Sequence, residues 1–315
     1  MNPQIMQMAQ IGRSRKSKVE SPKVKSPLMC GLQLSTVDCR LFPHRRNLRN
    51  LWIVFFPLLT IHFSLFAAGQ SAAAPAQTPP SVVDAKAQSL LDRCIRALGG
   101  DAFMNSKTLT TRGRVYSIHD EKTAGMAPFE SWVEYPDKRR FSYGKEKPVI
   151  LINDGDHGWH LDQFGQFEQT HEQIHNWQLA VRYNLENVLR LRVREPGALV
   201  QDGGVDFIDN LPAHVLEVFD SQHTHLKIYL STTNFRPIRI SYRLRNPQTD
   251  DFDDYSDVYS DYLSYEGVQT AMHMARFLND ERISETFRTF AQYNETYPPE
   301  MFQPVNLTPP TKGKK

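Results

Sequence analysis

Residues 129–162 constrain the fold most, because they hold strand patterns joined by specific turn chemistry. Residues 148–152 are apolar and rich in β-branched side chains, and a second short run at 158–161 follows the turn-forming segment 153–156. That segment contains an Asp-Gly pair, Asp154-Gly155, and both residue types tolerate positive φ. Such a pair between two strand-like runs is a strong hairpin signal. The sequence therefore predicts antiparallel β-structure here.

Two segments have the apolar spacing of a helix. The first ends at Gly99-Gly100, where glycine suits a left-handed C-cap. Its apolar stripe is Ala87, Leu90, Leu91, Cys94, Ile95 and Leu98. A cysteine on this stripe is expected to be buried and inert. The second helix is predicted over 172–191, with the apolar face Ile174, Trp177, Val181, Leu185 and Val188.

The other segments favour strands, and alternation with period 2 is clearest at 238–244. The expected strands follow one another as hairpins, with two helices and without the alternation of strand and helix that βαβ units show. This predicts an α+β domain built on an antiparallel sheet with one buried face. The expected strands are 109–118, 129–135, 140–143, 149–152, 158–161, 215–219, 226–230, 238–244, 255–263, 271–277 and 283–290.

An apolar segment at 51–68 indicates export. Arg45, Arg46 and Arg49 precede it and small residues follow it, as in a secretory signal peptide. We expect cleavage between Ala68 and Ala74. The alternative is an uncleaved inner-membrane anchor, because the segment is close to the ~20 residues that span a bilayer. In both cases the arginines stay in the cytoplasm and the rest of the chain is exported to the periplasm.

The expected organisation is a basic leader with the signal at 1–69, a linker at 70–81, one domain at 82–304 and an irregular basic tail at 305–315. The chain holds 37 Lys and Arg against 35 Asp and Glu. Residues 1–69 contain 10 and 2 of these, so the remainder holds 27 and 33, a net charge of −6. An acidic domain has no electrostatic footprint for nucleic acid. Cys94 is the only cysteine after the leader, which excludes an internal disulfide.

Several short motifs in residues 85–304 together resemble a known family. They are Ala97-Leu98-Gly99-Gly100, Arg112-Gly113-Arg114, residues 132–139, the hairpin at 150–155 with Trp159, Tyr259-Ser260-Asp261-Tyr262 with Gly267-Val268, and Phe302-Gln303-Pro304. In this order and spacing the domain resembles the LolA/LolB-like superfamily of periplasmic outer-membrane lipoprotein carriers.

The resemblance implies a strongly curved antiparallel β-sheet, an incomplete barrel, with helices packed over its concave face and an apolar cavity beneath them. It also implies a non-catalytic carrier without cofactor, whose partner is a lipid or an acylated lipoprotein, with a further partner among inner- or outer-membrane proteins. Burial of acyl chains would drive binding, at roughly 0.8 kcal/mol per CH₂. The ligand-binding residues implied on the cavity side are Phe129, Val133, Tyr135, Leu151 and Trp159.

One position departs from the family pattern. In the lipoprotein carrier itself, the residue before the Pro of the strand motif is an Arg that helps to hold the lid. Here that residue is Tyr135. A tyrosine hydrogen-bonds but supplies no positive charge. The resemblance therefore favours general lipophile binding over lipoprotein sorting.

Two alternatives from other functional classes stay open at this stage. The segment His171-Glu172-Gln173-Ile174-His175 matches the H-E-x-x-H pattern of zinc hydrolases. However, Thr170 is a good N-cap, which would place the match in exposed first turns, and no third ligand follows at a suitable spacing. The other alternative is an envelope sensor that binds a membrane-protein partner. The acidic segment 250–257 lacks the Gly and Glu of an EF-hand and is expected to be an exposed turn.

Overall fold

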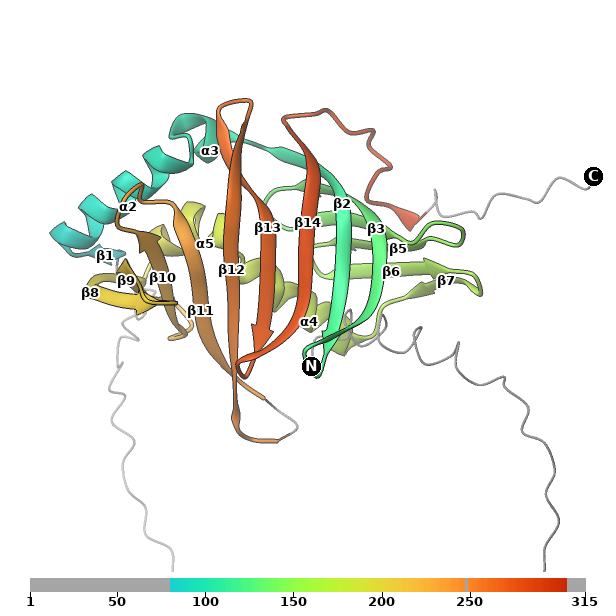
Figure 1. Cartoon of the computed structure of the whole chain (residues 1–315). Coiled ribbons are helices and arrows are strands. Elements are labelled where there is room, and N and C mark those ends of the chain that lie inside the picture. The colour runs from blue at the N-terminus through green and yellow to red at the C-terminus, as the bar shows by residue number, and fades with distance from the viewer. Residues whose placement is uncertain (1–79, 247–248, 305–315) are drawn as a thin grey trace, which may run out of the picture. The chain divides into compact units, whose positions relative to one another are not determined.

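The computed structural model describes residues 80–246 and 249–304 (Figure 1). The expected leader, most of the linker and the basic tail lie outside these residues. Within them, 14 strands form one sheet in the order β1-β8-β9-β10-β11-β12-β13-β14-β2-β3-β4-β5-β6-β7. The strands are β1 (Val82–Val83), β2 (Thr108–His119), β3 (Lys122–Glu134), β4 (Lys138–Tyr143), β5 (Val149–Asp154), β6 (His157–Asp162), β7 (Gly165–Glu168), β8 (Leu199–Ile208), β9 (Leu211–Phe219), β10 (His225–Ser231), β11 (Pro237–Arg245), β12 (Phe252–Tyr265), β13 (Val268–Leu278) and β14 (Glu281–Tyr293).

The sheet is curved and open. Strands β2 to β7 and β8 to β14 each follow one another as antiparallel neighbours, and β14 pairs with β2 to join the two halves. The described edges are β1, which pairs with β8 in parallel, and β7. In Figure 1 the helices α4 (His171–Arg182) and α5 (Leu185–Arg190) lie behind the central strands, on the concave side. This confirms the predicted α+β fold with an incomplete antiparallel barrel.

Helix α2 (Ala85–Leu98) matches its prediction. Asp84 caps its first turn by accepting a hydrogen bond from the Lys86 amide, and it ends at Gly99. Gly99 has φ +121°, and a Cβ there would collide with the Gly267 carbonyl, so only glycine fits. Cys94 is fully buried on the apolar stripe, and burial raises the pKa of its thiol. The short helices α3 (Asp101–Asn105) and η1 (Arg192–Arg194) complete the helical part.

The second predicted helix is wrong in one respect, because two helices occupy its range. Helix α4 has Thr170 as its N-cap, with a capping box, and Tyr183 as its C-cap. Asn184 then caps α5, since its side chain accepts a hydrogen bond from the Asn187 amide at 2.7 Å. An N-cap has extended backbone, so a strong cap inside an apolar periodic run starts a new helix there.

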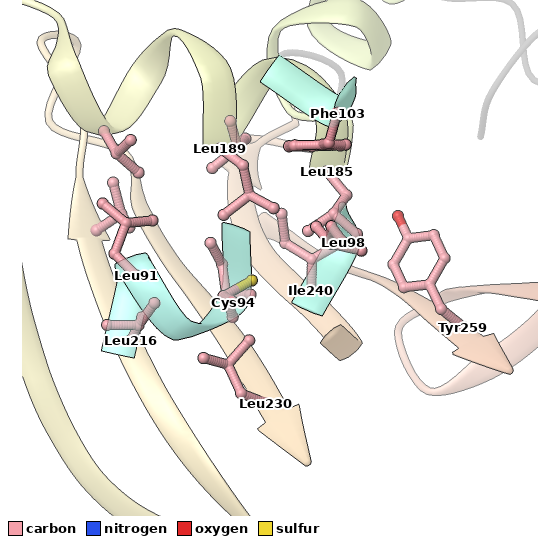
Figure 2. Close-up of a cluster of buried hydrophobic side chains, with 14 of the residues drawn as sticks. Leu91, Cys94, Leu98, Phe103, Leu185, Leu189, Leu216, Leu230, Ile240 and Tyr259 are labelled. Atoms are coloured by element: carbon pink, nitrogen blue, oxygen red, sulfur yellow. The ribbon is translucent and has the colours of Figure 1, made fainter. Parts of the chain in front are cut away.

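The main core lies between the helices and strands β8 to β14, and it reaches β2 through Leu109. Figure 2 shows side chains of α2, α3 and α5 meeting those of the sheet. Members with no exposed surface include Cys94, Val188, Leu189, Leu216, Leu226, Ile228, Leu230 and Ile240. Burying each aliphatic side chain of this size contributes about 1.5–3 kcal/mol, so this cluster holds the domain together.

Candidate functional site

The two faces of strands β3 to β6 have different neighbours. Phe129, Ser131 and Val133 pair with Tyr143, Phe141 and Arg139, so these side chains share a face. That face is the concave one, because the guanidinium of Arg139 lies 4.6 Å from the ring of Trp177 on α4. Phe129, Ser131 and Val133 therefore lie on the concave face.

A second apolar cluster occupies this concave face, and we call it the concave patch. Its buried members are Val115, Phe129, Tyr143 and Leu151, with Ala127, Phe141 and Val149 half-buried around them. The ring centroids of Phe129 and Phe141 are 5.5 Å apart, and those of Phe141 and Tyr143 are 5.7 Å apart. All of these residues come from strands, so no helix residue belongs to the patch. The concave patch is therefore separate from the main core.

Of the five predicted binding residues, Phe129 and Leu151 lie in the concave patch. Val133 and Tyr135 instead pack against the main core. The guanidinium of Arg190 on α5 lies 4.1 Å from the Tyr135 ring and 4.6 Å from that of Phe103. Burial, with the negative charge of Glu186 adding to it, holds the pKa of Tyr135 well above its usual value. Tyr135 thus contacts the helix layer through a cation–π pair whose charge comes from α5.

Trp159 lies on the opposite face. In the β5–β6 ladder Leu151 pairs with His160, whereas Trp159 pairs with Ile152. Trp159 therefore joins a convex cluster of Ile152, Leu161 and Phe302, with Tyr297 and Met301 around it. The structure does not bring Trp159 together with the other four residues. The ligand-binding role of all five stays a prediction.

Helix α4 covers the concave side loosely. Trp177 is its one buried residue, although the helix has 12 residues. A cavity of about 30 Å³ separates its residues Asn176, Leu179 and Ala180 from the sheet, room for about two water molecules. A larger hollow of about 620 Å³ lies beside β10 to β12, where most lining side chains are polar or charged. The small cavity is the space that remains between α4 and the sheet.

Charged groups lie beneath α4 as well. Arg276, which lines the small cavity, donates two hydrogen bonds to Asp257 at 2.7 and 2.8 Å. The Asp257 side chain is 5% exposed, and its charge raises the pKa of Arg276. Burial, followed by repulsion from Arg276, lowers the pKa of Arg139 to about 10. Sequence analysis missed Arg139 as a site residue, although it precedes Phe141 and Tyr143 at the i, i+2 spacing of one strand face.

The structure gives the zinc motif no support. His171, Glu172 and His175 are all exposed at the first turns of α4. Across residues 80–246 and 249–304, no group of three His, Cys, Asp or Glu side chains could hold a metal ion.

The prediction of an exposed turn at 250–257 is wrong from Phe252 onward, where strand β12 begins, and Asp257 is buried. Asp250 pairs with Arg245 and Asp254 with Arg243, so these two carboxylates form ion pairs at the surface.

Comparisons with known proteins report likenesses of fold. No family model and no curated protein matches the chain. Among solved structures, a DUF1329 family protein from Desulfovibrio piger is 11% identical, covering 70% of this chain and 99% of that chain, with a TM-score of 0.49. A putative outer membrane lipoprotein-sorting protein domain from Vibrio parahaemolyticus is 10% identical (70% and 99% covered, TM-score 0.47). A LolA superfamily protein from Nitrosomonas europaea is 14% identical (69% and 96%, TM-score 0.43).

The open curved sheet with helices over its concave face has the form that the resemblance of the sequence motifs implies. No helix in the part of the chain that the structure describes has the length and apolar character to cross a membrane, and residues 51–68 lie outside that part.

Proposed function

We propose that this protein is a non-catalytic carrier that binds the acyl chain of a lipid or of an acylated lipoprotein on the concave patch. The observation that carries the proposal is the separation of the two apolar clusters. The main core unites helices with strands, whereas the concave patch is made from strands alone. An apolar cluster on a concave sheet face, with no helix residue among its members, is suited to an apolar ligand.

The aromatic character of the patch supports a flexible hydrocarbon ligand. Phe129, Phe141 and Tyr143 present ring faces and edges along the strands, and Val149 and Ala127 border them half-buried. A 12-carbon chain gains roughly 10 kcal/mol on complete burial. Association costs about 4–15 kcal/mol, so appreciable affinity requires that most of the chain be buried. The ligand must therefore be covered from the helix side too.

Helix α4 is the element that we assign as the lid. Its C-terminal end is fixed, since Arg182 binds Glu195 and Asp220 with N–O distances of 2.7 Å. Its other anchor is Trp177, which lies under the guanidinium of Arg139. A rotation about Tyr183 and Asn184, where the helix axis breaks, would lift α4 from the sheet while α5 stays in the core. Opening would clear the concave side of the sheet on which the acyl chain would lie.

We infer that the protein acts outside the cytoplasm, in the periplasm. The support is the predicted signal segment at 51–68, with its arginines before and small residues after. The acidic balance of the remaining chain fits a soluble partner or lipid rather than nucleic acid. Retention of the segment as an anchor would place the same domain at the inner membrane.

Native mass spectrometry of the chain purified from cells without detergent tests the proposal. We expect a mass excess that matches a lipid or an acylated peptide, and its loss when Phe129 and Leu151 are both replaced by Asn. Replacement of Ile150, which lies on the opposite face, should leave the bound mass in place. A bare polypeptide that also fails to take up added acyl ligands would refute the carrier function.

A further inference from the structure

The hollow of about 620 Å³ beside β10 to β12 includes a row of side chains on the outer face of the sheet, and we call it the outer hollow. Ser241 pairs with Lys227 on β10 and with Ser256 on β12, so these three side chains share a face. Ile240, the neighbour of Ser241 in the chain, lies in the main core, which places the three on the face turned away from the helices. Figure 1 shows the three strands side by side. Two short serine side chains thus lie between longer ones.

The serines of the outer hollow offer hydrogen-bond donors. Ser256 is 4% exposed, and its hydroxyl accepts a hydrogen bond from Nη2 of Arg239 at 3.0 Å. A hydroxyl that accepts in this way can still donate its own hydrogen to a ligand. Residues paired across antiparallel strands have Cβ atoms about 4.5–5.5 Å apart, so one bound group can reach the hydroxyls of both Ser241 and Ser256.

Arg239 brings a positive charge to these hydroxyls. Among the described residues it forms no ion pair, and its side chain donates only to Ser256. Its Nε is buried without a hydrogen-bond partner. Arg243, by contrast, is neutralised by Asp254, to which it donates hydrogen bonds at 2.7 and 2.8 Å. A buried donor without a partner is unfavourable, and a bound acceptor removes that cost. The geometry around Arg239 therefore suits an anion.

We propose that the outer hollow binds a phosphate group, held by the guanidinium of Arg239 and the hydroxyls of Ser241 and Ser256. The arrangement of the donors selects the anion. The forked guanidinium and two hydroxyls on neighbouring strands need acceptors in several directions, which the oxygens of a tetrahedral phosphate supply and the two coplanar oxygens of a carboxylate do not. The hollow is large enough to hold the molecule that carries the phosphate as well. The site lies on the other face of the sheet from the concave patch and does not depend on the carrier function.

Titration calorimetry of the full chain at pH 7 with inorganic phosphate, glycerol 3-phosphate and acetate tests the site. We expect both phosphates to bind at least about tenfold more tightly than acetate, the effect of charge-assisted hydrogen bonds that acetate cannot all accept. Sedimentation with phosphatidylglycerol vesicles then identifies the source of the phosphate. Vesicle binding that Arg239→Met abolishes points to a lipid headgroup, and binding of the soluble phosphates alone points to a soluble phosphorylated compound.

Substitutions assign the binding to the named residues. Arg239→Met should weaken phosphate binding about tenfold or more, and Ser256→Ala about three- to tenfold. Asp254→Asn removes the carboxylate that neutralises Arg243, so it should tighten phosphate binding several-fold, a gain that misfolding does not produce. Arg96→Met is the matched control, because it removes the same charge from an exposed position of α2 outside the hollow. It should change the dissociation constant by less than about twofold.

The outcomes that would overturn the inference are distinct. Acetate binding as tightly as phosphate would exclude a phosphate site, and so would failure of both the phosphates and the vesicles to bind the wild-type chain. Equal losses in Arg239→Met and Arg96→Met would show attraction to net charge rather than a site. Phe129→Asn, in the concave patch, should leave phosphate binding unchanged, so the carrier function and this site stand or fall separately. Circular dichroism of the variants, matched to the parent, shows that any loss of binding is not a loss of fold.

Discussion

Helices α4 and α5 are consecutive in the chain, yet they attach to the sheet very differently. In α5 five of the six residues are buried, and Val188 and Leu189 are fully enclosed in the main core. In α4 a single residue of 12, Trp177, is buried, and a small cavity lies beneath the helix. The comparison teaches that the helix layer has a densely packed part and a loosely packed part, divided at Asn184. The loosely packed part is the lid that we propose for the concave patch.

The largest effect is expected from truncating the densely packed helix. Leu189→Ala should lower the free energy of unfolding by about 2–5 kcal/mol, because it leaves a cavity in a fully packed core. The matched change in the lid, Leu179→Ala, should cost about 1 kcal/mol, since Leu179 is half-buried beside an existing cavity. Urea denaturation of both variants measures the difference. Equal losses would abolish the distinction between the helices.

Arg190→Met tests how α5 is fixed to strand β3. Arg190 donates to the carbonyl and hydroxyl of Ser106 at 3.1 and 2.6 Å and lies over the Tyr135 ring. Losing these contacts should lower the free energy of unfolding by about 2–3 kcal/mol. Tyr135→Phe keeps the ring beneath the cation, so we expect it to lower the free energy of unfolding by less than about 1 kcal/mol. If the phenylalanine variant were the more damaging, the hydroxyl rather than the ring would be what fixes α5.

Trp177→Ala tests whether the lid unfolds separately. Replacing a tryptophan by alanine in a cooperatively folded core lowers the free energy of unfolding by about 3–5 kcal/mol. For a lid that opens locally we expect about 1–2 kcal/mol in global stability, together with faster proteolytic cleavage within residues 171–183. Limited proteolysis and urea denaturation of the same variant give both values. A full core-sized loss without new cleavage would make α4 part of the core.

The smallest expected effect is a pH dependence at the fixed end of the lid. Burial raises the pKa of Glu195, but hydrogen bonds from Ser221 and Arg192 outweigh this and leave the pKa below its usual value. A lowered pKa means that the carboxylate stabilises the fold at pH values above the ordinary pKa. This contribution is lost as the pH falls through the lowered value. The melting temperature of Glu195→Gln should therefore fall less steeply on acidification than that of the parent chain. Equal slopes for the two chains would contradict the assignment.

The sequence predicted the fold where a local pattern matched the final packing. The stripe of α2 with Gly99-Gly100 and the alternation of β11 both belong to elements with one buried face. Strand β8 was missed because residues 201–204 are Gln-Asp-Gly-Gly, and the strand is polar and half-exposed near an edge of the sheet. Helices α4 and α5 were merged because apolar residues keep their spacing across Asn184. That break is decided by a side-chain cap, which apolar periodicity does not reveal.

The candidate site was predicted less well, and Trp159 shows why. Residues that pair across a two-residue hairpin lie on the same face of the sheet. For any two-residue turn that includes Gly155, Trp159 pairs with an even-numbered residue of β5. Trp159 therefore lies on the face opposite to Leu151. This information was present in the sequence, but the five residues were chosen by resemblance. By contrast, the meeting of Arg139 with Trp177 joins strand β4 to helix α4, and no local pattern encodes that contact.

Hydrogen–deuterium exchange of the full chain, with and without dodecanoate, tests the division of the helix layer most directly. We predict that amides of α4 exchange through local opening, much faster than those of α5, which exchange only with global unfolding. Dodecanoate should then slow exchange in α4 and in strands β3 to β5, and leave β8 to β10 unchanged. Exchange of α4 and α5 at one common rate, with no response to dodecanoate in either, would contradict both the lid and the binding site beneath it.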